Sequence, residues 1–214
     1  RGATPRAAAF ATLTPPHATT LILTHHTCLV EIQGSGFLSE PPNIGMTADA
    51  LYAAVSENFI ENDGSLPGVE IICPDVESLS LLYRTLRDHS AAGEGDAECW
   101  SVEDECQRLV RDYSNIAAEV ASGRVNACHF VFDDLRVEEE LIPGIGVFVW
   151  RDRIGLDWRM GPAWTVDEIF RFFVLLNRLV VLCVDNRLVS EEPEGPPDPA
   201  GFMNSWKAFS DQIR

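Results

Sequence analysis

Two adjoining runs of alternating residues constrain the fold more than any other feature of this chain. They cover residues 145–150 and 153–158, and only Arg151 and Asp152 separate them. In the second run Ile154, Leu156 and Trp158 alternate with Arg153, Gly155 and Asp157. Because successive side chains of a strand point to opposite faces, this pattern predicts a β-hairpin with one apolar and one polar face. The chain must therefore contain a β-sheet.

Capping signals place two helices beside that sheet. Asp75 follows a short predicted strand at Val69–Cys73 and can cap a helix over 75–89, whose apolar residues share one face. The tetrapeptide that begins at Thr165 is a capping box, and the apolar residues flanking it form a hydrophobic staple. We expect a second helix there, over 165–177. The following run, 179–184, could continue this helix or form a strand.

The segment 101–121 carries apolar residues at helical spacing and is followed by Gly123, a good C-cap. It predicts a third helix. A fourth is expected from Thr47, as N-cap, through Asn58.

Further strands are expected at 19–24, 28–33 and 125–132. The sequence thus predicts an α/β or α+β fold, with a mixed sheet of about five or more strands and three to five helices. We expect a single domain over 1–190, an acidic linker with four prolines over 191–200, and a C-terminal amphipathic helix over 201–214.

The C-terminal helix has an apolar stripe that needs a partner surface. A helix of this length is marginal alone, so the stripe must be buried for the helix to persist. Docking onto the chain's own body is the simpler interpretation, and docking onto a second copy, giving a homodimer, is the alternative. The stripe consists of Phe202, Trp206, Phe209 and Ile213.

The charge balance excludes several classes of partner. The chain has 16 Lys and Arg against 33 Asp and Glu, a net charge of −17, and 46% of its residues are hydrophobic. It is apolar enough to fold, and its negative potential repels phosphate backbones and anionic lipids. We therefore expect no general nucleic-acid binding and no membrane binding, and a basic protein is the favoured partner.

The six cysteines are dispersed, and four of them sit in apolar runs. This pattern indicates free, mostly buried thiols in a reducing compartment, which predicts a cytoplasmic protein, although six cysteines would also allow three bridges. The longest apolar stretch, 172–184, is too short to span a bilayer, and no signal peptide is expected.

No catalytic fingerprint stands out, and we predict no catalytic residue, metal ligand or cofactor. His25, His26 and Cys28 would need a further ligand such as Cys128 or His129, and their spacing matches no zinc pattern. The arginines and tryptophans that interleave around the 145–158 hairpin could hold a phosphate or a base, but structural support is the simpler interpretation. They are Arg151, Arg153, Arg159, Trp150, Trp158 and Trp164.

The clearest functional signal is a run of acidic residues without any base. We predict that it forms the partner-binding surface, with residues 133–140 as a second acidic region. The alternative is that the run only caps the helix expected over 101–121 and keeps the protein soluble. The run consists of Glu94, Asp96, Glu98, Glu103, Asp104 and Glu105.

An acidic binding module, and not an enzyme, is therefore the expected function. The class that fits best is a bacterial immunity or inhibitor protein that neutralises a basic toxin or effector by masking its positive surface. Two alternatives stay open: an enzyme whose Cys/His or metal-assisted hydrolytic site is assembled only by the fold, and a structural subunit of a larger assembly.

Overall fold

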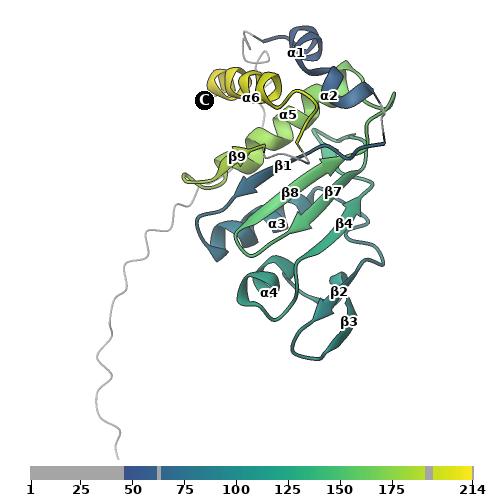
Figure 1. The fold of residues 1–214 in the computed structure, drawn as a ribbon, viewed down its shortest axis with the longest axis vertical. Coiled ribbons are helices and arrows are strands. Elements are labelled where there is room, and N and C mark those ends of the chain that lie inside the picture. Colours follow the sequence, from purple (N-terminus) through teal and green to yellow (C-terminus); the bar gives the residue numbers. More distant parts are fainter. Residues whose placement is uncertain (1–45, 62–63, 191–194, 214) are drawn as a thin grey trace, which may run out of the picture. The chain divides into compact units, whose positions relative to one another are not determined.

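A five-stranded antiparallel sheet forms the centre of the computed structural model, which describes residues 46–61, 64–190 and 195–213 (Figure 1). The strand order is β4-β7-β8-β1-β9. Six helices accompany the sheet in the described ranges, so the predicted α/β class and the number of strands are confirmed. The strands are β1 (Gly68–Ile72), β4 (Cys128–Phe132), β7 (Ile145–Val149), β8 (Arg153–Trp158) and β9 (Arg187–Val189).

The hairpin expected at 145–158 is present as β7 and β8. Its register pairs Val147 with Leu156 and Phe148 with Gly155. Each strand buries one set of alternating side chains, because those side chains lie on the face of the sheet that the helices cover. The strand expected at Val69–Cys73 is β1, which lies between β8 and β9.

The helices begin where the sequence places caps. Thr47 accepts a hydrogen bond from the Ala50 N–H at the start of α1, and Asp75 accepts one from the Ser78 N–H at the start of α3. The helix at Thr165 also begins as expected, but the Thr165 side chain makes no capping bond. The helices are α1 (Ala48–Val55), α2 (Glu57–Ile60), α3 (Val76–Asp88), α4 (Ile116–Ser122), α5 (Val166–Val181) and α6 (Pro199–Ile213).

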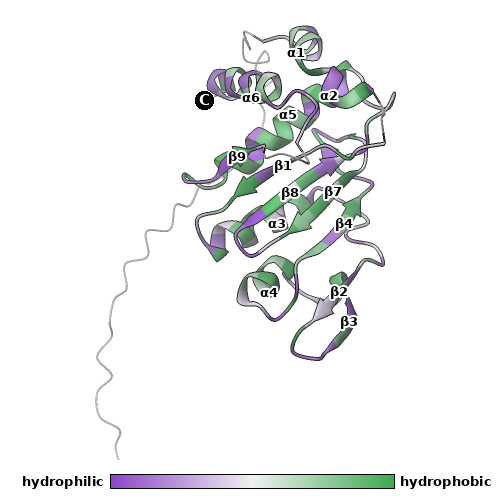
Figure 2. Cartoon of the chain, in the orientation of Figure 1, coloured by the Kyte–Doolittle hydropathy of each residue, from purple (hydrophilic) through white to green (hydrophobic). Residues whose placement is uncertain are grey.

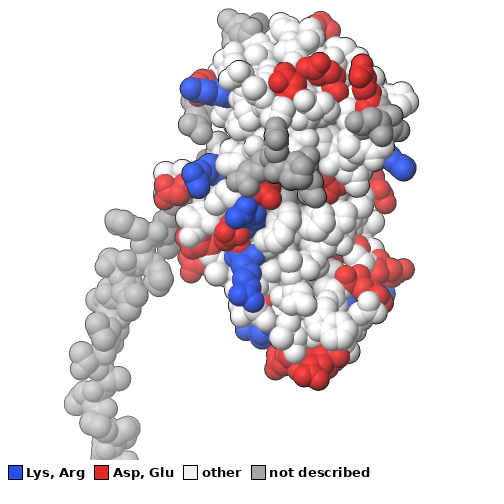
Figure 3. Space-filling model, in the orientation of Figure 1, with Lys and Arg blue, Asp and Glu red and all other residues white. Residues whose placement is uncertain are grey.

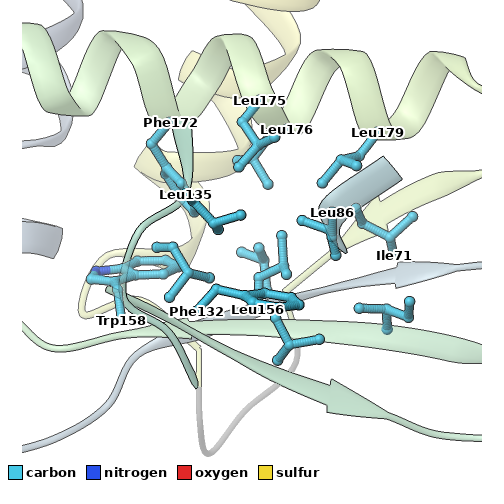
Figure 4. Packing of buried hydrophobic residues seen from close by; sticks show 14 of the residues in the cluster. Ile71, Leu86, Phe132, Leu135, Leu156, Trp158, Phe172, Leu175, Leu176 and Leu179 are labelled. Carbon is cyan, nitrogen blue, oxygen red and sulfur yellow. The ribbon is translucent and has the colours of Figure 1, made fainter. Parts of the chain in front are cut away.

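The main core lies between the sheet and α5. Figure 4 shows side chains of α5 pointing toward residues of β1 and β8, with Leu86 of α3 in the same layer. At one end Trp158 stacks on Phe59 with ring centroids 5.0 Å apart, and its indole N–H donates to the Asn58 carbonyl. In Figure 2 the hydrophobic colour follows the sheet strands and α5. Burial of this scale is the dominant stabilising contribution to such a fold.

One helix expectation is wrong in its first half. Residues 98–109 form a β-hairpin of β2 (Glu98–Ser101) and β3 (Cys106–Leu109), followed by a 3₁₀ turn over Val110–Asp112. Only the end of the expected helix exists, as α4, which Asn115 caps and which ends at Gly123 with φ 79°. Residues 124–126 supply backbone hydrogen-bond partners to β2 and the residue that follows it: Val102 N–H donates to the Arg124 carbonyl at 2.8 Å. These bonds favour a strand here, because the backbone groups of a helix would already be bonded within the helix.

The C-terminal helix packs on the chain's own body. Phe202 and Phe209 are fully buried and Trp206 is 7% exposed, and both phenylalanines lie within 5.6 Å, centroid to centroid, of Phe173 in α5. Of the stripe, only Ile213 is substantially exposed. Three of the four residues that the homodimer alternative would use are thus already buried within this chain.

Some expected features lie outside the described residues, and others were not expected at all. The strands at 19–24 and 28–33 and residues 191–194 of the linker fall outside the described ranges, and the last two residues of the expected linker, 199–200, already belong to α6. Local sequence patterns did not predict β9 or the small hairpin of β5 (Arg136–Val137) and β6 (Glu140–Leu141). Within the described ranges, each helix is too short or too polar to cross a bilayer.

Candidate functional site

Glu94, the first residue of the predicted acidic surface, lies in the interior. Its side chain is 2% exposed, accepts a hydrogen bond from the Tyr83 hydroxyl and lies 3.3 Å from the Arg87 guanidinium. Burial, and then the bond to Glu94, raises the pKa of Tyr83 well above its ordinary value of 10.0. Glu94 therefore holds α3 to the loop before β2 and is not available to a partner.

The remaining predicted residues belong to the β2–β3 hairpin or lie directly before it. Glu98 is exposed on β2, and Glu103, Asp104 and Glu105 occupy the turn. Asp104 holds this turn together: its backbone N–H donates to Ser101 Oγ at 3.1 Å, and its carboxylate lies 3.2 Å from Arg108. Since no helix begins here, helix capping does not explain the acidic run.

Three of these carboxylates form no ion pair, although Glu119, its ion-pair partner, and then Glu103 raise the pKa of Arg124. Residues 96–112 contain 6 acids and 2 bases, a net charge of 2 − 6 = −4. The two arginines already pair, Arg108 with Asp104 and Arg111 with Asp96 at 2.7 Å. No residue of the described ranges forms an ion pair with the other three carboxylates of the hairpin, which belong to Glu98, Glu103 and Glu105.

An exposed tryptophan accompanies these charges. Alternation along β2 turns Cys99 and Ser101 inward, so that Glu98 and Trp100 face solvent together. Trp100 is 47% exposed and Val102, which continues the same outward row, is 46% exposed. We call the outward row and the turn the hairpin face, made of Glu98, Trp100, Val102, Glu103 and Glu105.

Figure 3 shows acidic atoms gathered at the lower end of the molecule, where Figure 1 places the β2–β3 turn. The hairpin is fixed to the body by backbone bonds, since Asn126 N–H donates to the Trp100 carbonyl at 3.0 Å and Ser101 forms a bridge with Val125. Backbone bonds therefore anchor the strand that carries Glu98 and Trp100 to the body.

In the second acidic region, 133–140, two of the five acids make structural contacts. The Asp134 carboxylate accepts hydrogen bonds from the Ser90 hydroxyl and from the backbone N–H groups of Ala91 and Ala92, at 2.8 and 2.7 Å to the latter two. These bonds, that of Ser90 first, lower the pKa of Asp134. Glu138 pairs with Arg178 of α5 at 3.1 Å.

Four of the six arginines and tryptophans around the 145–158 hairpin have structural contacts. Trp158 and Trp164 belong to the core, with 0% and 2% exposure. Trp150 stacks on Phe148 at 4.9 Å, and Arg153 pairs with Glu70 at 2.7 Å. These contacts agree with the structural role expected for the group.

Cysteine and histidine side chains show no catalytic arrangement in the described part of the chain. Cys128 and His129 point to opposite faces of β4, and burial raises the pKa of the Cys128 thiol to about 12. His129 Nε2 instead lies 2.9 Å from Asp157 Oδ2. The described residues contain no group of three potential metal ligands, and His25, His26 and Cys28 lie outside them.

Comparison with known proteins adds no relative: the chain matches no family model, and neither a curated protein nor a solved structure is significantly similar to it.

Proposed function

We propose that this protein binds a basic protein partner through the hairpin face. The partner would be a toxin or effector with a positive surface, and binding would neutralise it by covering that surface, as an immunity or inhibitor protein does. The proposal includes a cytoplasmic location in a bacterium. The free thiols at all five cysteines of the described ranges support this location.

The observation that carries the proposal is the exposed Trp100 among unpaired carboxylates. Tryptophan is enriched among the few residues that dominate binding energy in protein interfaces. An indole left 47% exposed in water is an energetic cost that a partner removes by covering it. Its strand is held to the body by backbone hydrogen bonds, which limits the backbone entropy lost on binding.

The carboxylates supply the second element of recognition. A local charge of −4 over residues 96–112 attracts a positive surface and raises the rate of association at low salt. The flanking carboxylates also suit a Lys or Arg stacked on the indole, because the cation then meets both the ring face and a negative charge. In this proposal the carboxylates favour a positively charged partner, and burial of the indole contributes most of the binding free energy.

The two alternative classes find less support in the described residues. A thiol nucleophile needs a low pKa and a nearby base, whereas burial raises the pKa of both Cys73 and Cys128 to about 12. A structural subunit would expose a large apolar surface, but the aromatic stripe of α6 is buried within this chain.

Affinity capture from native lysate at low and high salt tests the proposal. The bait is the full chain, beside a variant with Glu98, Glu103 and Glu105 changed to Lys. A control bait carries the same charge change outside the hairpin, at the exposed Glu57 of α2, Glu61 directly after α2 and Asp211 of α6. Asp104 is left intact because it holds the turn.

The wild-type and control baits should retain a basic protein at low salt, release much of it at high salt, and inhibit any activity it has. The hairpin variant should retain little of it. Retention of the same proteins by all three baits would overturn the proposal.

A further inference from the structure

The outer edge of β3 offers unpaired backbone groups. β2 and β3 form a two-stranded sheet of their own, and in the described ranges β3 has β2 as its one strand neighbour. On the other side of β2, residues 124–126 supply backbone partners. The hairpin is therefore closed on one edge and open on the other.

The register shows which residues point outward. In an antiparallel ladder, residue pairs that exchange backbone hydrogen bonds alternate with pairs that do not. Val110 N–H donates to the Ala97 carbonyl at 2.8 Å, which makes this a bonded pair, so the next bonded pairs along the register are Cys99 with Arg108 and Ser101 with Cys106. Gln107 and Leu109 consequently direct their N–H and C=O groups away from β2.

The neighbouring strand confirms this alternation. Trp100 is the register partner of Gln107, and its carbonyl accepts from Asn126 N–H on the far side of β2. Trp100 and Gln107 therefore form a pair that does not exchange bonds. Since Gln107 is an exposed residue, its outward backbone groups are accessible to another chain.

We infer that the basic partner docks by adding an extended segment of its own as a third strand beside β3. The inference rests on the proposed function and specifies how that surface binds. An unpaired edge is a template for pairing with another chain, and main-chain hydrogen bonds to such an edge are a recurrent way of binding extended peptides. The segment would pair with Gln107 and Leu109.

Charge selects which segments can occupy this edge. Every second side chain of an added strand lies on the hairpin face, in the row that continues from Trp100 and Gln107. Glu105 lies in the turn directly before β3, at the end of that row, so Lys or Arg near this end of an added strand would meet a negative charge. The occupant is accordingly an extended segment with a cationic residue at every second position.

A synthetic peptide pair tests strand addition directly. The probe is a ten-residue peptide of alternating Arg and Val, and its control has the same sequence with N-methyl groups on every second residue. Methylation removes the donors that strand pairing needs and leaves the charge unchanged. Binding to the full chain is measured by NMR titration at low salt, together with hydrogen exchange of the Gln107 and Leu109 amides.

The unmodified peptide should bind at least tenfold more tightly than the methylated one, and it should slow exchange at both amides. The variant Gln107→Pro should bind the two peptides equally, because proline removes one outward donor and is tolerated on an edge strand when that N–H faces solvent. Gln107→Ala is the matched control and should behave as wild type.

The outcomes separate the inference from the proposed function. Equal binding of both peptides to wild type, without protection of the two amides, would overturn strand addition and leave recognition by charge intact. Absence of binding by either peptide would also overturn strand addition. A different result would contradict the proposed function: retention of the same proteins from lysate by the hairpin charge variant and the control bait.

Discussion

The turn between β5 and β6 predicts that replacing two glutamates will stabilise the protein. Val137 pairs with Glu140, so Glu138 and Glu139 form the whole turn. Their φ angles are 55° and 68°, which is the left-handed region that side chains with a Cβ disfavour. Two-residue hairpin turns with positive φ at both positions strongly prefer Asn-Gly. We therefore expect Glu138→Asn/Glu139→Gly to relieve backbone strain.

The gain follows from two opposing contributions. The left-handed conformation costs a residue with a Cβ about 1–2 kcal/mol, and asparagine and glycine avoid part or all of this. Replacing Glu138 also removes its ion pair with Arg178, whose side chains are 61% and 42% exposed. A pair so exposed contributes about 0–1 kcal/mol. The net stabilisation is about 2 kcal/mol, which for a chain of this size raises Tm by about 4–8 °C.

Differential scanning calorimetry and urea unfolding measure this gain. Glu139→Ala is the matched control, because alanine removes the charge but retains the Cβ that causes the strain. The double variant should be clearly more stable than the control. Equal stability of the two would refute the assignment of strain to this turn.

Three further predictions concern the core, the acid response and the thiols. Trp206→Ala should destabilise the monomer by about 3–5 kcal/mol in thermal unfolding, because it empties a buried site, whereas the exposed Lys207→Ala should change little. The lowered pKa of Asp134 stabilises the fold above about pH 4 and loses this effect as the pH falls, so the stability difference between wild type and Asp134→Ala, followed by urea unfolding, should shrink from pH 5 to pH 2.5. Cys73 and Cys128 should resist iodoacetamide at pH 8 until the protein unfolds, as peptide mapping by mass spectrometry would show, because burial raises both pKa values to about 12.

Local signals predicted the parts of the fold in which neighbouring residues determine the structure. The 145–158 hairpin follows from a period of two, and α3 follows from the cap at Asp75 and one apolar face. The small hairpin of β5 and β6 could not be found this way, since its turn is Glu-Glu where a turn of this type usually carries Asn-Gly.

Tertiary contacts determine the structure of the segment whose predicted helix, over 101–121, is wrong in its first half. Residues 101–121 fit a helical period, but backbone bonds from 124–126 hold β2 as a strand. The sequence Glu98–Ser101 does not alternate apolar and polar residues, so the strand that places Trp100 and Glu98 on one face could not be predicted from its pattern. The burial of Glu94 depends on Tyr83 and Arg87 of α3, which no local pattern links to it.

The association rate of the hairpin charge variant tests the central claim most directly. Changing Glu98, Glu103 and Glu105 to Lys shifts the charge of residues 96–112 from −4 to −4 + 6 = +2, whereas the control at Glu57, Glu61 and Asp211 leaves it at −4. Both variants have the same net charge. Stopped-flow or surface plasmon resonance measures their association rates with the captured basic protein at several salt concentrations.

The hairpin variant should associate severalfold more slowly than the control at low salt, and the difference should shrink as salt screens the charges. Equal association rates for the two variants at low ionic strength would contradict the claim that the hairpin face guides and binds a basic partner.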